Sequence, residues 1–168
     1  MKLILASLAF LTTTSTAGTP PTGSPKVCKK EGSPLISLHH LGDPAQVPPS
    51  KDSQPAPLTG AFVIWPSGGY TPFDQDLKTG KVSNERNQCL DDADFTAVKD
   101  ALAKATWKFT QAKIRCMAIS FDHTEWTAKD KIVWDDRMCS GDIPDATTKK
   151  AIELVQGLET KLTAKTKK

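Results

Sequence analysis

Residues 91–110, DDADFTAVKDALAKATWKFT, contain a helix pattern followed directly by a strand pattern. Carboxylates gather at the beginning, where the free N–H groups and the positive dipole end of a helix favour them. Apolar residues then recur at steps of three and four, namely Phe95, Val98, Ala101, Leu102 and Ala105. These features predict a helix that ends near Ala105. The alternation of residues 106–110 predicts a strand immediately after it.

Three further strands are predicted on either side of this helix. Residues 61–65 are β-branched and aromatic and are bounded by glycine and proline. Residues 114–121 are apolar in both parities, as in a strand that is covered on two faces, and residues 131–134 form a short apolar run. Residues 122–125 are interpreted as the beginning of a polar connection between the last two strands.

A second helix is predicted at the C-terminal end. Its apolar stripe begins after Pro144-Asp145 and comprises Ala151, Ile152, Val155, Leu158 and Leu162. Strands and helices do not alternate regularly along the chain, so a doubly wound parallel sheet is not expected. We expect an α+β fold: an antiparallel sheet of three to five strands with two helices packed on it.

The N-terminal residues have the composition of a secretory signal peptide. Lys2 is followed by an apolar run at residues 3–11 and then by small and hydroxyl-bearing residues that suit a signal peptidase. The apolar run is too short for a membrane-spanning helix. We expect residues 1–17 to be removed, so that the mature chain begins at Gly18 and is secreted.

Residues 18–58 contain nine prolines together with many serines and threonines, which oppose regular helices and central strands. We expect an extended arm here, with one short strand at residues 35–39. Residues 59–168 are expected to form a single α+β domain that ends in a basic amphipathic helix. From Ala146 onward the chain has six lysines and two glutamates, which is typical of a solvated surface.

The chain has four cysteines, Cys28, Cys89, Cys116 and Cys139. An even set in a secreted chain predicts two disulfides. Three pairings are possible, and the spacing does not select one of them. The wide spacing argues against a zinc site, which uses close pairs of ligands. We predict no metal and no cofactor.

Charge and motifs exclude several function classes. With 22 basic and 19 acidic residues the formal charge is +3, which is too balanced for a dedicated nucleic-acid-binding protein. The sequence contains no phosphate loop, nucleophile elbow, zinc-protease motif or calcium loop. The adjacent aspartates Asp91-Asp92 and Asp135-Asp136 are interpreted as a helix cap and as strand residues on opposite faces.

One group of residues has the composition of a catalytic site. His123 and Glu125 are two positions apart, which places both side chains on one face of an extended strand. With Arg115 and the histidines His39 and His40, they would supply a base, an acid and a cation for phosphodiester cleavage. Small secreted fungal ribonucleases use a similar set on a helix-and-sheet fold. A ribonuclease-like protein, active or inactive, is therefore an alternative function, and a nucleic-acid partner is expected only in that case.

Two tryptophans provide a second alternative. If Trp126 and Trp134 faced outward together, they would stack on sugar rings and bind carbohydrate, although such residues usually lie in the core of a small domain.

The signal peptide, the proline-rich arm, the four spaced cysteines and the compact α+β body resemble small secreted fungal effector proteins. Within residues 89–116, the order of cysteine, helix, Trp107, strand and cysteine resembles the necrosis-inducing factor domain of such effectors. The order departs from that family at the end, because the final helix here follows Cys139. The resemblance implies a virulence-type effector that binds a host protein or another host macromolecule. Because the sequence has no strong catalytic spacing, we expect this protein to act without catalysis, and the size of the mature chain is that of a monomeric domain. The resemblance transfers no functional residue.

Overall fold

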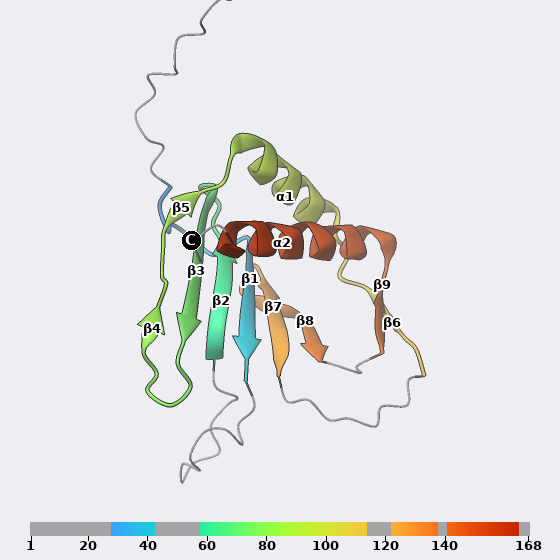
Figure 1. Cartoon of the computed structure of the whole chain (residues 1–168). Coiled ribbons are helices and arrows are strands. Elements are labelled where there is room, and N and C mark those ends of the chain that lie inside the picture. The colour runs from blue at the N-terminus through green and yellow to red at the C-terminus, as the bar shows by residue number, and fades with distance from the viewer. Residues whose placement is uncertain (1–27, 43–57, 114–121, 138–140, 165–168) are drawn as a thin grey trace, which may run out of the picture.

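The computed structural model describes residues 28–42, 58–113, 122–137 and 141–164 (Figure 1). Its strands and helices, in chain order, are β1 (Ile36–Leu41), β2 (Leu58–Ile64), β3 (Gly69–Gln75), β4 (Val82–Ser83), β5 (Gln88–Cys89), α1 (Asp92–Lys104), β6 (Phe109–Gln111), β7 (His123–Ala128), β8 (Lys131–Arg137), β9 (Asp142–Pro144) and α2 (Ala146–Ala164). The predicted signal peptide and the predicted strand at residues 114–121 lie outside these ranges.

Within the described residues, the main sheet has seven strands, not the three to five that the sequence predicted. Its order is β4-β3-β2-β1-β7-β8, with β5 paired to β3, and neighbouring strands are antiparallel. β7 explains part of the difference, since residues 122–125 were predicted to begin a polar connection. Most of its residues are polar and half-buried, and only Trp126 is fully buried. β4 and β5 have two residues each, too few to show a pattern.

β1 lies inside the main sheet, between β2 and β7 (Figure 1). Leu38 of β1 pairs with Phe62 of β2 and with Trp126 of β7, and all three side chains are buried. The strand predicted at residues 35–39 is therefore a central strand. Residues 36–41 are therefore part of the folded domain, whereas the sequence predicted that the domain begins only at residue 59 and that an extended arm precedes it.

Helices α1 and α2 pack on one face of the main sheet and against each other (Figure 1). Both begin where the sequence predicts: Asp91 caps α1 by accepting a hydrogen bond from the Asp94 N–H (2.7 Å), and α2 follows Asp145. The core between helices and sheet is made of Ile36, Leu38, Phe62, Ile64, Tyr70, Leu90, Val98, Trp126, Ile152, Val155 and Leu158. We call this side of the sheet the helix face and the opposite side the outer face.

β6 and β9 form a separate two-stranded sheet. Phe109 of β6 stacks on Trp134 of β8, with 5.4 Å between the ring centroids. The strand predicted at residues 106–110 begins only at Phe109, because Trp107 has a left-handed backbone (φ 52°) that no extended strand accommodates. Within the described ranges, no helix is long and apolar enough to cross a membrane.

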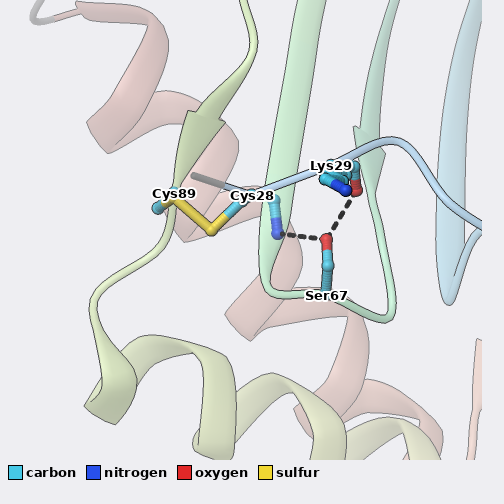
Figure 2. The surroundings of a disulfide bond; sticks show 5 residues. Cys28, Lys29, Ser67 and Cys89 are labelled. Carbon is cyan, nitrogen blue, oxygen red and sulfur yellow. Dashed lines mark hydrogen bonds between the residues drawn. A yellow bond between two sulfur atoms is a disulfide. The ribbon is translucent and has the colours of Figure 1, made fainter. Parts of the chain in front are cut away.

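A disulfide joins Cys28 to Cys89 and ties the segment before β1 to β5 (Figure 2). The Ser67 hydroxyl donates a hydrogen bond to the Lys29 carbonyl (2.6 Å) beside it. Gly69 pairs with Cys89, and a Cβ at Gly69 would lie 3.1 Å from the Cys28 Cβ, so this position favours glycine. One disulfide of the predicted two is thus present, and Cys116 and Cys139 lie outside the described residues.

Candidate functional site

The sheet separates the residues that were predicted to act together. Side chains alternate between faces along a strand, and paired residues of neighbouring strands share a face. His40 lies on the helix face, where it pairs with Thr124 of β7. His123 and Glu125 lie on the outer face, since both are one position away from Thr124. Glu125 therefore does not converge with His40, although His123 and His40 line one cavity at the end of β7, and Arg115 lies outside the described residues.

His40 is held by both of its ring nitrogens. Nε2 lies 2.6 Å from Oε1 of Glu159 in α2, and Nδ1 lies 3.1 Å from the Thr124 Oγ1. The hydrogen bond to Glu159 raises the pKa of His40 above its ordinary value of 6.5, against the opposing effect of burial. In the protonated form both N–H groups donate, one to the carboxylate and one to the hydroxyl. A ring that is held in this way has no free lone pair with which to act as a general base.

A row of paired residues that includes His40 crosses five neighbouring strands of the sheet, β3, β2, β1, β7 and β8. In register order it consists of Asp74, Gly60, His40, Thr124 and Asp136. Gly60 leaves a gap in the row, and a Cβ there would lie 2.8 Å from the Phe73 carbonyl oxygen. Burial is the main cause of the raised pKa of Asp136, and nearby carboxylates add to it. The row lies on the helix face, below the C-terminal half of α2, which contributes Glu159.

Two cavities flank His40. The first has a volume of about 520 Å³, and its polar lining includes Asp74, Asn84, Arg86 and Glu159. The second, of about 590 Å³, is lined by Asp122, His123, Thr124 and Asp136, among others. We call the two cavities and this row of residues the His40 groove. Even when His40 is protonated, the four carboxylates outnumber the two positive groups, Arg86 and His40, and give this groove a negative potential that favours positively charged ligands.

The outer face has its own charged cluster. His39 pairs with Glu125 across β1 and β7, and burial lowers the pKa of His39, while Glu125 opposes this shift. His123 Nε2 lies 3.6 Å from Asp135 Oδ1, and Arg137 Nε donates to the other oxygen of Asp135 at 2.6 Å. Asp135 and Asp136 thus face opposite sides of the sheet, as their adjacent positions in β8 predict.

The two tryptophans predicted as a sugar platform do not form one. Trp126 is 0% exposed and packs against Trp107 and Trp134, with 6.4 and 5.7 Å between ring centroids. Trp134 is half-buried, stacked on Phe109, and its Nε1 donates to Asp142 (3.3 Å). The carbohydrate alternative required both side chains to face outward, whereas the helix face of β7 and β8, on which both tryptophans lie, packs against the core.

Glu159 was missed by the sequence analysis although a signal for it exists. It lies four positions after Val155 and three before Leu162, within the apolar stripe of α2. A carboxylate on the inward side of an amphipathic helix needs a buried partner, and here that partner is His40. The outward lysine Lys161, which was predicted as part of a solvated surface, instead contacts Asp94 of α1 (2.7 Å).

Among the described residues, no three side chains of histidine, cysteine, aspartate or glutamate lie together in a way that could hold a metal ion. Comparisons of the chain with models of protein families, with curated proteins and with solved structures found no match.

Proposed function

We propose that the protein is a secreted, disulfide-stabilised effector that binds a host macromolecule without catalysis. The placement of His40 on the helix face and of Glu125 on the outer face carries this proposal. His40 is held on both ring nitrogens, so this histidine is a structural group and has no free lone pair with which to act as a base. The disulfide between Cys28 and Cys89 supports passage through an oxidising compartment.

The His40 groove is the surface through which this binding takes place. Its carboxylates, Asp74, Glu159, Asp122 and Asp136, come from four different parts of the chain and line two cavities that share His40. A positively charged segment of a partner protein complements this arrangement. Electrostatic complementarity of this kind acts mainly on the association rate and on specificity, and it weakens with salt.

Binding is tested with fluorescent peptides and the full oxidised chain. A short lysine- and arginine-rich peptide should bind the wild type more tightly than a glutamate-rich peptide, and added salt should weaken the binding. The double variant D74N/D136N should reduce the affinity about tenfold, since each lost charge contact contributes roughly 0.5–1 kcal/mol. D100N, on the exposed surface of α1, is the matched control. Equal binding of both peptides, or an unchanged double variant, would show that the groove does not bind a basic segment.

Secretion is tested separately by intact mass. The chain, expressed with its own N-terminus in a eukaryotic secretory host, should appear in the medium beginning at Gly18 with all four thiols oxidised. A product that stays in the cell, retains residues 1–17 and has free thiols would contradict the proposal that the protein is secreted and disulfide-stabilised.

A ribonuclease remains the second candidate because of the outer face. His39, Glu125, His123 and Arg137 lie there on three neighbouring strands, which assembles two histidines, a carboxylate and a cation on one surface. Incubation of the oxidised protein with RNA decides between the candidates. We expect no cleavage. Cleavage that is abolished by both H123A and E125A, and that H40A leaves intact, would replace the binding proposal by this outer-face site.

A further inference from the structure

A third cavity, remote from the His40 groove, lies between the C-terminal half of α1 and the turn that joins β7 to β8. Its volume is about 460 Å³, within the range of roughly 300–1,000 Å³ that is typical of small-molecule sites. Its apolar lining is continuous with the core, because five of the side chains that line the cavity also pack against the core cluster: Leu35, Leu102, Trp107, Ala128 and Val133. Apolar walls of this kind bind hydrocarbon or aromatic groups.

Three lysines, Lys99, Lys129 and Lys131, also line the cavity, and no acidic residue is part of its lining. Within the described part of the chain, none of the three is paired with a carboxylate. The nearby carboxylate of Asp130 accepts a hydrogen bond from the Ser33 hydroxyl (2.5 Å). The cavity therefore combines apolar walls with uncompensated positive charge, which attracts an anion.

The backbone beside the cavity is held in an uncommon conformation at Trp107, whose φ of 52° is a genuine outlier for a bulky side chain. Lys129 and Asp130 have φ 50° and 60°, as a two-residue hairpin turn between β7 and β8 requires. The Trp107 N–H donates to the Oγ1 of the fully buried Thr148 (2.9 Å), which fixes the conformation of Trp107. Such strain is maintained only where the surrounding structure determines it, and it is concentrated at ligand sites.

From these observations we infer that this cavity binds a small amphipathic carboxylate, with its hydrocarbon part against Leu102, Trp107 and Val133 and its anionic group at Lys99 and Lys131. The charge of the lysines selects an anion over a neutral or cationic amphiphile of equal length. This site is independent of the His40 groove, and either can exist without the other.

The test uses dodecanoate as the probe, below its micellar concentration, with the full oxidised chain. Binding is followed by displacement of the fluorescent anion anilinonaphthalene sulfonate and, independently, by the NMR shift of the Trp107 indole N–H. Dodecanol and dodecylamine are the charge controls. We expect dodecanoate to bind, dodecanol to bind about tenfold more weakly, and dodecylamine not to bind.

Two variants make the result specific. K99E/K131E should lose dodecanoate binding and gain dodecylamine binding, whereas K150E, on the exposed surface of α2, should behave like the wild type. Circular dichroism verifies that each variant is folded, and the reversal of ligand preference itself requires an intact cavity. Equal binding of all three probes, no shift at Trp107, or unchanged dodecanoate binding in K99E/K131E would overturn the inference.

Discussion

At the scale of single residues, neighbouring histidines of β1 experience opposite environments. His40 faces Glu159, which raises its pKa above 6.5, whereas burial lowers the pKa of His39 on the other face. A raised histidine pKa means that the folded state binds the proton more tightly than the unfolded state does. The stabilisation from His40 is therefore fully present below pH 6.5 and is lost as the pH rises through the raised pKa.

We predict mirror-image pH profiles for two variants. H40Q should lose stability relative to the wild type by about 0.5–1 kcal/mol at acidic pH, after allowance for solvent screening of a side chain that is 37% exposed. H39Q should show the opposite trend, with a relative gain below pH 6.5, where the wild type must protonate a buried ring. Urea denaturation from about pH 5 to pH 8.5 measures both differences. A constant difference for H40Q across this range contradicts the role assigned to Glu159.

At the scale of elements, the N-terminus of α2 depends on one side chain. Asp145 Oδ1 accepts hydrogen bonds from the N–H groups of Thr147 (3.0 Å) and Thr148 (2.8 Å), and the Thr106 hydroxyl donates to its other oxygen. These hydrogen bonds hold the pKa of Asp145 far below its ordinary value. The charged carboxylate therefore stabilises the fold above pH 3.8, and this contribution is lost as the pH falls towards the lowered pKa.

Removal of this cap should lower the melting temperature. For D145A we expect a decrease of about 3–6 °C at neutral pH, because two N–H groups lose their acceptor and the tie to Thr106 is lost. D145N, which keeps an acceptor oxygen but no charge, should lie between D145A and the wild type. Differential scanning calorimetry measures the three melting temperatures. If D145A and the wild type have the same melting temperature, α2 does not need this cap.

Helices were predictable from the sequence because their signals are local. Asp91 and Asp145 mark both N-termini, and the apolar stripes follow from spacing. The strands were less predictable: β7 has a single buried residue, Trp126, and β1 lies among prolines. Strand pairing depends on residues far apart in sequence, so the number and order of strands could not be derived. The same holds for the site, since His40 and Glu159 are 119 residues apart.

At the scale of the whole molecule, the disulfide closes a large loop. Cys28 and Cys89 are 61 residues apart, and this loop contains β1, β2, β3 and β4. The variant C28S/C89S should lose about 4 kcal/mol of unfolding free energy by the chain-entropy relation. Urea denaturation of the purified variant measures this loss. S67A, which removes only the hydrogen bond to Lys29, is the matched control and should lose far less. Similar losses for both variants would assign the stabilisation to the anchoring of the segment rather than to loop closure.

The interior position of β1 determines when the chain can fold during synthesis. β1 emerges early, but its second neighbour, β7, lies 84 residues later, as the contact between His40 and Thr124 shows. Until β7 emerges, one side of β1 has unpaired backbone groups, which are a template for aggregation. Native folding must therefore wait until most of the polypeptide has left the ribosome, a consequence of the high sequence separation of its contacts. A nascent chain arrested before residue 123 should remain sensitive to protease, whereas one arrested well beyond α2 should be resistant.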